Sequence, residues 1–340
     1  MHPIRKALIT EFGDASKVVV VDASIAAPAA REAQIAVEYS ALSGADINMR
    51  RGVYPFQPPA PLTPGYVVVG TVVALGARCE QVRVGQRVAC MTVTGGQAER
   101  VNLAGQLLVP VPDGVDPRQA ACLVLDWNTA WQMLALAQRR SDCRRIFVHG
   151  LSGAVGNALM RLALMRGIAV FGTASPRHHR ALQEAGAYPL TYADKEWIAS
   201  MTLTGGVDAV FDPLGFESHA DSYAVLRRGG LLVAYGFNLP ALTDSATRPV
   251  LPAVLKLYAR NLRFWSGKRS TFYWISRDDT SFKPGLLSLF ELAAAGRIEA
   301  AIKAVLPLEQ IGLAHRAWGQ GGPGDKVGSF VIAVGAQGAA

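Results

Sequence analysis

The sequence has little cysteine, little charge and no long apolar run. Its 340 residues include four cysteines, none in a Cys-x-x-Cys pair, and six histidines that form no metal-ligand spacing with them. This excludes a disulfide scaffold and argues against a metal site. Neither a run of 18 uncharged apolar residues nor an apolar signal segment occurs, so no membrane span and no signal peptide are predicted. We expect a soluble, cytoplasmic protein with reduced thiols.

The composition is that of a globular protein with an excess of positive charge. Half of the residues are apolar and 18% are charged, which excludes a disordered chain. There are 34 Lys and Arg against 26 Asp and Glu, a net charge of +8. The basic residues are scattered, with no run of five. The charge therefore favours a phosphorylated small ligand, and nucleic-acid binding remains a minor alternative.

Both ends of the chain contain short β-like runs rich in Val, Ile and Ala. The predicted strands are Lys6–Thr10, Lys17–Val21, Gln34–Tyr39, Tyr66–Leu75, Gln86–Val93, Ala304–Pro307 and Lys326–Ala333, with helices over Leu286–Ala294 and Glu309–Ala317. Residues 51–65 contain five prolines and are expected to form an irregular loop. Loops of this length are more often functional than not.

From Pro117 on, helical and strand signals alternate. Strands are predicted at Arg145–His149, Ala169–Gly172, Ala187–Thr191, Val207–Phe211, Leu231–Tyr235 and Asn261–Trp265, and helices at Pro117–Ala137, Ala154–Arg166, Arg177–Glu184, Trp197–Met201 and Ser218–Leu226. This spacing indicates βαβ units and a parallel sheet. We therefore expect an α/β protein. Residues 124–268 form a Rossmann domain with a doubly wound sheet, inserted into a β-rich domain of residues 1–123 and 269–340.

The strongest local signal is a glycine-rich turn after an apolar strand. The strand Arg145–His149 leads into Gly150–Gly156, and a helix follows. Small residues allow backbone N–H groups to approach a pyrophosphate, and the helix N-terminus adds partial positive charge. The strand–turn–helix context makes this signal stronger than glycines alone, although such a turn can also serve packing only.

The end of the second strand indicates which dinucleotide is bound. A protein that uses NAD places an Asp or Glu about 20 residues after the glycines. No acid occurs in Phe171–Arg180, where Ser175, Arg177 and His179 offer a hydroxyl and basic groups instead. Such groups bind a 2′-phosphate, which a carboxylate would repel. The sequence thus predicts NADPH; the alternative is the basic first turn of a surface helix.

The sequence resembles the medium-chain dehydrogenase/reductase superfamily. It is most similar to the zinc-independent branch of zeta-crystallin-type quinone oxidoreductases, enoyl thioester reductases and vesicle amine transport protein-like reductases. The motifs are Asp46–Pro55, Thr63–Gly65 leading to Gly70, Val84–Val88, Thr129–Trp131, Gly150–Gly156, Asp212–Gly215, Gly229–Gly236 and Lys326–Val327. They cover essentially the whole chain. The resemblance implies a GroES-like catalytic domain made from both chain ends, NADPH beside a Rossmann domain, and a homodimer.

The resemblance also implies a set of cofactor contacts. Ser152 to Gly156, with Gly153, Ala154 and Val155 between them, would hold the pyrophosphate, and Ser175 with Arg177 or His179 the 2′-phosphate. The expected cofactor-binding set is completed by Thr129, Thr173, Tyr192, Leu214, Gly215, Gly236, Phe237, Phe272 and Lys326.

The sequence departs from relatives at several polar positions. Zinc-dependent members need an early Cys, a His-Glu pair and a four-Cys lobe, whereas here Ser43 lies near the first position and the lobe is missing. Tyr66 stands where most relatives carry Glu, Ala154 replaces a glycine, and Asp126 stands where Asn or Lys is common. Without zinc, alcohol oxidation by Lewis-acid polarisation is disfavoured.

A metal-free site with NADPH suits the reduction of an activated double bond. Negative charge then develops on a carbonyl oxygen, and a donor must stabilise it. Tyr54 is the candidate catalytic donor, since its segment resembles that of enoyl thioester reductases; alternatively it only packs on a ligand. The expected substrate-lining residues are Ser43, Asp46, Asp126, Trp127, Tyr273 and Trp274. Asp46 has a structural alternative, bonding loop amides, and His149 is expected to be a structural residue bonded to backbone.

We therefore expect an enzyme, an NADPH-dependent reductase of a quinone or α,β-unsaturated carbonyl. The first alternative is an enoyl-acyl thioester reductase acting on CoA or acyl-carrier substrates. The second is a protein without turnover that binds NADPH or RNA.

Overall fold

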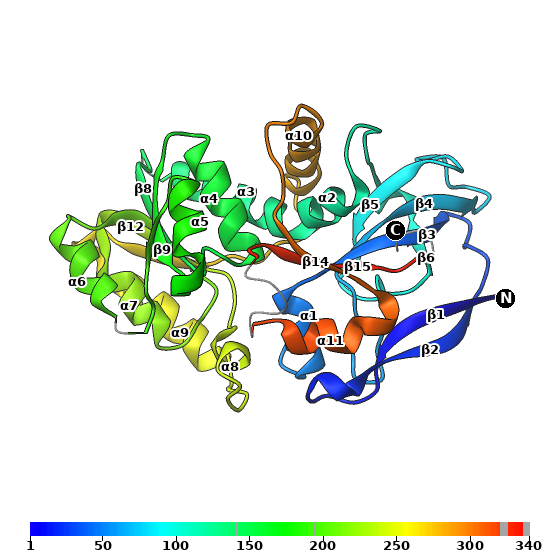
Figure 1. The fold of residues 1–340 in the computed structure, drawn as a ribbon, viewed down its shortest axis with the longest axis horizontal. Coiled ribbons are helices and arrows are strands. Elements are labelled where there is room, and N and C mark those ends of the chain that lie inside the picture. Colours follow the sequence, from blue (N-terminus) through cyan, green and yellow to red (C-terminus); the bar gives the residue numbers. More distant parts are fainter. Residues whose placement is uncertain (141, 194, 320–325, 336–340) are drawn as a thin grey trace. The chain divides into compact units, whose positions relative to one another are not determined.

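The computed structural model describes all residues except 141, 194, 320–325 and 336–340. The described residues separate into two compact units (Figure 1). Unit 1 comprises Met1–Asn128, Arg277–Gly324 and Ser329–Ala340, and unit 2 comprises Thr129–Ser276 and Asp325–Gly328, each without its undescribed residues. The two ends of the chain therefore share one unit. The domain limits 1–123 with 269–340, and 124–268, remain our proposal.

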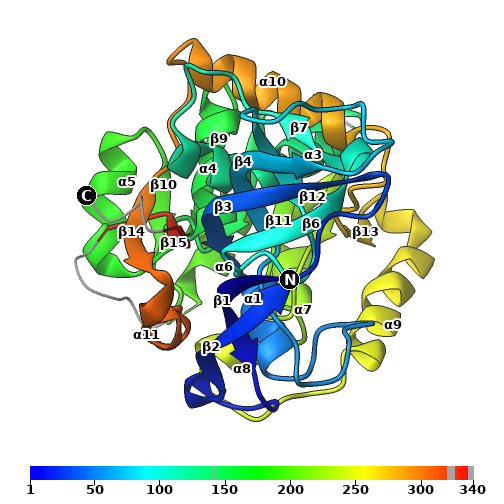
Figure 2. The same cartoon turned by 90° about the vertical axis from the view of Figure 1, so that its right-hand side faces the viewer.

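Unit 1 is built mainly from antiparallel strands. Its elements are β1 (His2–Ile9), β2 (Val18–Ile25), β3 (Glu32–Leu42), α1 (Gly44–Arg50), β4 (Val67–Leu75), β5 (Arg87–Met91), β6 (Arg100–Ala104), β7 (Val109–Pro110), α2 (Pro117–Cys122), α10 (Phe282–Ala294), β14 (Ile302–Pro307), α11 (Ile311–Ala317) and β15 (Ser329–Ala333). One sheet has the order β14-β15-β3-β4-β5-β7, with β6 paired to β3. β1 and β2 form a separate hairpin, beside which α11 lies (Figure 2). The strands predicted at both chain ends are present; β6 and β7 are not predicted by the sequence patterns.

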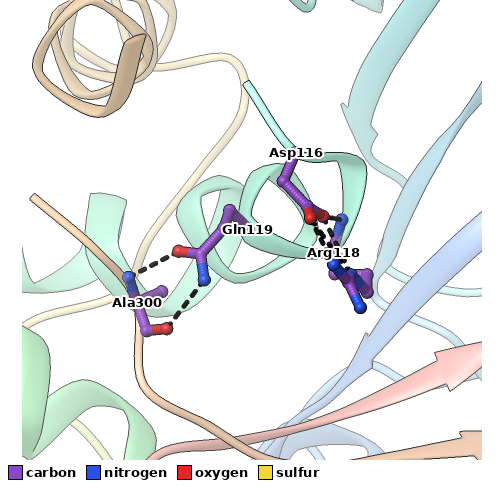
Figure 3. Close-up of polar contacts among 4 residues, drawn as sticks. All are labelled: Asp116, Arg118, Gln119 and Ala300. Atoms are coloured by element: carbon purple, nitrogen blue, oxygen red, sulfur yellow. Dashed lines mark hydrogen bonds and ion pairs between the residues drawn. The ribbon is translucent and has the colours of Figure 1, made fainter. Parts of the chain in front are cut away.

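An amide side chain ties the tail of the chain to its first part. Asp116 caps α2 by accepting a hydrogen bond from Arg118 N (2.7 Å). Further along α2, Gln119 Nε2 donates to Ala300 O (3.0 Å), and Gln119 Oε1 accepts from Ala300 N (2.6 Å), as Figure 3 shows. The side chain thus pairs with backbone 181 residues away, just before β14. This contact helps to fix the tail in the β-rich unit.

Unit 2 contains a parallel sheet with helices on both faces. Its elements are α3 (Asn128–Gln138), β8 (Arg145–His149), α4 (Ala154–Leu164), β9 (Ala169–Thr173), α5 (His179–Glu184), β10 (Tyr188–Leu190), α6 (Glu196–Leu203), β11 (Val207–Asp212), α7 (Ser218–Ala224), β12 (Leu226–Ala234), α8 (Leu239–Leu242), α9 (Leu251–Ala259) and β13 (Arg269–Phe272). The strand order is β10-β9-β8-β11-β12-β13, with every pair parallel. α4 and α5 lie on one face, and α6, α7 and α9 on the other (Figure 1).

This order is that of a doubly wound Rossmann sheet. The direction of winding reverses between β8 and β11, and ligands of such sheets bind beyond the carboxyl ends of the strands at this point. The core on one face includes Phe147 of β8, whose ring stacks on Trp197 at 4.7 Å between centroids. The predicted alternation of strands and helices is confirmed.

The prediction of a strand at Asn261–Trp265 is wrong. Residues Arg260–Leu262 and Phe264–Ser266 form two 3-10 turns, and the sixth strand is β13. Leu262, Phe264 and Trp265 are exposed, so the apolar run does not lie in the sheet. The run resembles a buried strand in composition only.

The predicted helix over Pro117–Ala137 is present, with an interruption. Between α2 and α3 the segment Leu123–Trp127 is π-helical, and all five of its residues are buried. Single π-helical turns inside α-helices often occur at functional sites. None of the described helices is both long enough and apolar enough to cross a membrane.

Candidate functional site

In unit 2, the turn after β8 favours glycine at two positions. Gly150 has a left-handed φ of +74°, and a Cβ on Gly156 would lie 2.1 Å from Gly150 O. Gly150 N and Leu151 N both donate to Thr173 O (3.0 Å each), which ties the turn to the end of β9. The backbone therefore approaches itself closely, directly at the reversal point of the sheet.

The first turn of α4 follows without a side-chain cap. Its N-cap residue, Gly153, makes no side-chain hydrogen bond, and the first turn carries no acidic residue. The first amides of a helix have no intrahelical acceptor, and the helix dipole gives them partial positive charge. In addition, Gly328 N donates to Ser152 O (3.0 Å), which brings the segment that begins at the exposed Lys326 against the turn. These features fit the pyrophosphate of a dinucleotide.

The residues expected at the 2′-phosphate lie together after β9. Ser175 is partly exposed and begins the 3-10 turn Pro176–His178. Arg177 is exposed, and its Nε donates to His178 Nε2 (3.2 Å). His179 Nε2 is paired with Ala174 O (3.2 Å), so that ring nitrogen is already engaged. Ser175 and Arg177 are thus the accessible members of the set.

Tyr192 and Thr129, two further expected cofactor residues, differ in their exposure. The Tyr192 side chain is exposed, whereas Thr129 is buried at the start of α3. The exposure of Tyr192 is compatible with contact to a ligand. Thr129 could present only a small part of its surface.

A buried carboxylate, to which the sequence analysis assigned no role, organises the loop after β11. Asp212 Oδ1 accepts from Leu214 N (2.8 Å) and Gly215 N (3.2 Å). Its Oδ2 accepts from the hydroxyls of Ser218 (2.8 Å) and Ser222 (2.7 Å). Burial alone would raise the pKa of Asp212, but His149, His219 and the two hydroxyl donors lower it below its usual value. The sequence signal that could have indicated this role is the position of Asp212 at the end of a strand.

The loops after β11 and β12 contact each other. Gly215 has φ +79°, and a Cβ there would lie 2.6 Å from Phe237 Cδ1. A Cβ on Gly236 would lie 2.8 Å from Pro213 O. Phe237 stacks on Phe272 of β13, with centroids 5.2 Å apart and planes at 11°. Four expected cofactor residues therefore lie together, and Leu214 belongs to the same loop.

His149 is structural, but not in the expected way. Its Nδ1 is paired with the Thr173 hydroxyl (3.2 Å) and its Nε2 with the Ser222 hydroxyl (3.0 Å), so the predicted bond to backbone is wrong. Burial lowers the pKa of His149, which keeps the ring neutral. A neutral ring can accept from one hydroxyl and donate to the other, and so joins β8, β9 and α7.

The last expected residues of unit 2 follow β13. Tyr273 N donates to Ala234 O (2.7 Å), which extends the pairing with β12 by one residue. The Trp274 side chain is about half exposed, in keeping with a ligand-facing position.

In unit 1, Ser43 and Asp46 form a reciprocal cap at the start of α1. The Ser43 hydroxyl donates to Asp46 Oδ2 (2.7 Å), as does Ser43 N (2.9 Å), while Gly65 N donates to Asp46 Oδ1 (3.0 Å). Asp46 is completely buried. Burial raises the pKa of Asp46 despite these donors. Its structural interpretation is therefore supported, and it has no surface with which to line a substrate pocket.

Tyr54 contacts Tyr66, the residue directly before β4. Their hydroxyl oxygens are 2.6 Å apart, and the rings meet edge to face at 5.9 Å and 74°. Tyr66 is buried, and its carbonyl accepts from Thr92 N (2.9 Å). Tyr54 is partly exposed, with its N–H bonded to Gln57 Oε1 (2.9 Å). Burial and the adjacent Tyr66 hydroxyl raise the pKa of Tyr54, which keeps the phenol protonated.

Asp126 lies in the π-helical segment and is buried. Its Oδ2 accepts a hydrogen bond from the Ser329 hydroxyl (2.7 Å). Burial raises the pKa of Asp126 to about 7, with a contribution from nearby Asp46 and some opposition from the Ser329 hydrogen bond. Trp127 is likewise buried. Both residues are therefore core residues in unit 1, and Asp126 can change its charge near neutral pH.

Comparison with known families matches both parts of the chain. Residues 29–113 match the alcohol dehydrogenase GroES-like domain, and residues 178–324 match a zinc-binding dehydrogenase family. The chain belongs to the medium-chain dehydrogenase/reductase superfamily. The predicted family is thereby confirmed. So is the predicted fold class, a GroES-like domain with a Rossmann sheet.

The individual relatives include quinone oxidoreductases and VAT-1 homologs. Quinone oxidoreductase of Mus musculus is 29% identical over 247 residues, 70% of this chain and 74% of that protein. The synaptic vesicle membrane protein VAT-1 homolog of Homo sapiens is 31% identical over 239 residues, 68% of this chain but only 61% of that protein. The match thus spans about three fifths of the VAT-1 homologs. The structure of Escherichia coli quinone oxidoreductase complexed with NADPH has a TM-score of 0.81 at 21% identity, covering 97% of this chain and 99% of that one.

One of the matched families is named for zinc. In the part of the chain that the structure describes, however, no group of three or more His, Cys, Asp or Glu residues is placed to hold a metal ion. All four cysteines are buried, and none of them forms a disulfide in the part of the chain that the structure describes.

Proposed function

We propose that this protein is an oxidoreductase that uses NADPH, without zinc, to reduce a quinone or an α,β-unsaturated carbonyl. The observation that carries the proposal is the turn Gly150–Gly156, whose close backbone approach leads into the uncapped N-terminus of α4. This geometry suits a pyrophosphate. Further support comes from the quinone oxidoreductase relatives, one of which is solved with NADPH.

Residues of unit 2 would contact the successive parts of a bound dinucleotide. Ser152 to Gly156 would hold the pyrophosphate, and Ser175 with Arg177 the 2′-phosphate. The loops at Gly215 and Phe237 would border the ribose and the nicotinamide. NADPH bound there would supply the hydride. The absence of an acid after β9 supports NADPH over NADH, because a carboxylate would repel the 2′-phosphate.

In unit 1, Tyr54 is our candidate for stabilising the charge that develops on the substrate oxygen. Its raised pKa means that it keeps its proton at neutral pH, so it acts as a hydrogen-bond donor and not as a base. The Tyr66 hydroxyl, 2.6 Å away, can donate in turn to the Tyr54 oxygen as that oxygen gains negative charge. Neither residue needs a metal for this role.

The test is NADPH oxidation by the purified full chain with 1,4-naphthoquinone, 1-cyclohexenone and crotonyl-CoA. Turnover of the quinone or the enone supports the proposal, whereas a clear preference for the thioester favours an enoyl-acyl thioester reductase. NADPH binding without turnover of any of them, or salt-sensitive RNA binding alone, would contradict a reductase. A homodimer in the cytoplasm completes the proposal; the buried cysteines, which form no disulfide among the described residues, support a reducing compartment.

A further inference from the structure

A cation lies near the Tyr66 member of the tyrosine pair in unit 1. Arg277 stands between β13 and α10 in the sequence and is partly exposed. Its Nη1 donates to Met91 O (3.0 Å) and Thr92 O (3.3 Å), at the carboxyl end of β5. The guanidinium is close enough to Tyr66 and Cys90 to oppose the rise in pKa that burial causes in both groups. A positive charge is therefore held beside the proposed hydrogen-bond donors.

The backbone that holds Arg277 is bonded directly to the backbone around Tyr66. Thr92 N donates to Tyr66 O (2.9 Å), and the Thr92 hydroxyl donates to Gly65 O (2.7 Å). The next residue, Val93, has a φ of +72°, which a β-branched residue seldom adopts. Such strain persists only where surrounding contacts maintain it, and it is frequent at functional sites. The end of β5 therefore fixes the guanidinium relative to Tyr66.

Part of the Arg277 guanidinium is not engaged by the part of the chain that the structure describes. Both side-chain hydrogen bonds come from Nη1, so Nε and Nη2 donate to none of the described residues. Nor does a described carboxylate form an ion pair with Arg277, although Asp278 and Asp279 follow it in the sequence. Asp279 Oδ1 accepts instead from Ser281 N (2.8 Å) and from the Ser281 hydroxyl (2.6 Å). The side of the planar group formed by Nε and Nη2 matches the two oxygens of a carboxylate.

We propose that Arg277 binds an anionic group of the substrate, and that the quinones or α,β-unsaturated carbonyls reduced by this protein carry a carboxylate. This inference rests on the proposed function, because it takes the Tyr54 hydroxyl as the donor to the substrate's carbonyl oxygen. The carboxylate would accept from Nε and Nη2 while Nη1 stays bonded to the end of β5. The redox balance is unchanged, since the substrate takes a hydride from NADPH and a proton from the solvent, and NADP⁺ is released.

The carboxylate and the carbonyl oxygen would then be held at two separate points. Contact with Arg277 at one end and with Tyr54 at the other fixes the orientation of a small planar substrate. A carboxylate gains two charge-assisted hydrogen bonds at Arg277, whereas an uncharged analogue displaces water from the guanidinium without replacing those bonds. The site therefore favours the charged substrate over its uncharged parent.

The first experiment measures binding without turnover. Calorimetric titration of the full chain, with and without NADP⁺, compares 1-naphthoate with 1-naphthamide, which contain neither a quinone nor an enone. Wild-type protein should bind the carboxylate about 10- to 100-fold more tightly, and Arg277→Met should bring this ratio to about 1. Arg277→Lys keeps the charge but loses the planar fork, so it should lower the ratio about 5-fold. Arg78→Met, which removes an exposed arginine of unit 1, should keep the wild-type ratio.

The second experiment measures NADPH oxidation with 1,4-naphthoquinone and with its 2-carboxylate. The readout is the ratio of kcat/KM for the two quinones, because their difference in intrinsic reactivity cancels when a variant is compared with wild type. Arg277→Met should lower the ratio of carboxylated to parent quinone about 10- to 100-fold, mainly through KM of the carboxylated quinone. Arg78→Met should leave the ratio unchanged.

The two experiments separate this inference from the proposed function. A carboxylate preference in binding that Arg277→Met abolishes, without turnover of either quinone, would support the anion site and contradict the reductase. Turnover of both quinones with a ratio that Arg277→Met leaves unchanged would support the reductase and overturn the anion site.

Three other results would also overturn the anion site. The first is wild-type protein that binds 1-naphthoate no better than 1-naphthamide. The second is an equal loss of preference in Arg78→Met, which would show an effect of overall positive charge. The third concerns the hydrogen bonds of Arg277 to β5, whose loss can destabilise Arg277→Met. Should that variant not fold, Arg277→Lys decides, and an unchanged ratio there would show that Arg277 only ties its segment to β5.

Discussion

The hydroxyl oxygens of Tyr54 and Tyr66 lie 2.6 Å apart in unit 1. Tyr54 comes from the proline-rich loop, and Tyr66 lies directly before β4. A reciprocal cap centred on Asp46 fixes the backbone of the adjacent Gly65. Burial raises the pKa of both phenols. Two neutral phenols in contact can form a chain of two hydrogen bonds. In this chain Tyr66 donates to the Tyr54 oxygen, and Tyr54 donates to an acceptor outside the pair.

The pair predicts unequal effects for two conservative substitutions. Tyr54→Phe should lower kcat about 100-fold, because the donor to the substrate oxygen is lost. Tyr66→Phe should lower kcat about 10-fold with KM nearly unchanged, because Tyr54 remains but loses its support. Steady-state NADPH oxidation over pH 6–9 measures both. Tyr39→Phe, another tyrosine of unit 1, is the control. Equal rates for all variants would remove the proposed role of the pair.

Two glycines in one turn should respond differently to alanine. In Gly156→Ala the new Cβ would lie 2.1 Å from Gly150 O, so the turn must shift and NADPH affinity should fall about 100-fold with a lower Tm. In Gly153→Ala the distance is 3.3 Å and φ is −78°, so the fold should tolerate the methyl group. Fluorescence titration of NADPH and thermal melts measure the contrast. Unchanged binding in both variants would mean that the turn does not hold the pyrophosphate.

The choice between NADPH and NADH should depend on Ser175 and Arg177. Replacing both with alanine removes a hydroxyl and a guanidinium, so NADPH affinity should fall about 10- to 100-fold while NADH affinity stays the same. The comparison uses titrations with each nucleotide. Arg139→Ala, an exposed arginine of the same unit, controls for the loss of one positive charge. If the double variant weakens both nucleotides alike, these residues do not contact the 2′-phosphate.

The sequence analysis succeeded where a local period decides the structure. The alternation of strands and helices from Arg145 onward predicts a parallel sheet of βαβ units, because each strand and helix has its own apolar repeat. The prediction failed at Asn261–Trp265. The apolar composition of this segment is typical of a strand, but its large apolar side chains are exposed in two 3-10 turns. The spacing of apolar residues shows which positions are apolar. It does not show whether other parts of the same chain bury them.

Contacts that join distant segments could not be read from the sequence. The role of Asp212 depends on donors from a loop and from α7, which only the folded chain brings together. Tyr54 could be selected by its resemblance to a family motif. Its contact with Tyr66, however, crosses an irregular loop that has no repeat to predict its path. Likewise, His149 was recognised as structural, but its hydroxyl partners come from β9 and α7.

The buried Asp126 should make stability depend on pH in a predictable direction. Its pKa in the folded protein is about 7, above the ordinary value of 3.8 that applies when the chain is unfolded. Between these values the folded state binds more protons, so the free energy of unfolding falls as pH rises. This contribution to stability is fully present below about pH 4 and is lost as pH rises through 7.

Asp126→Asn removes this dependence, because the amide is neutral and can still accept a hydrogen bond from the Ser329 hydroxyl. Relative to wild type, the variant should gain stability steadily from pH 4 to 7 and reach a constant advantage of a few kcal/mol above pH 8. Urea unfolding at pH 5, 6, 7 and 8 measures the difference. Asp113→Asn, an exposed carboxylate of unit 1, should show no such gain. A difference between Asp126→Asn and wild type that stays flat or shrinks with pH would mean that Asp126 is ionised in the folded protein throughout this range. A charged carboxylate without a cationic partner at this depth would then have to be stabilised by donors other than Ser329.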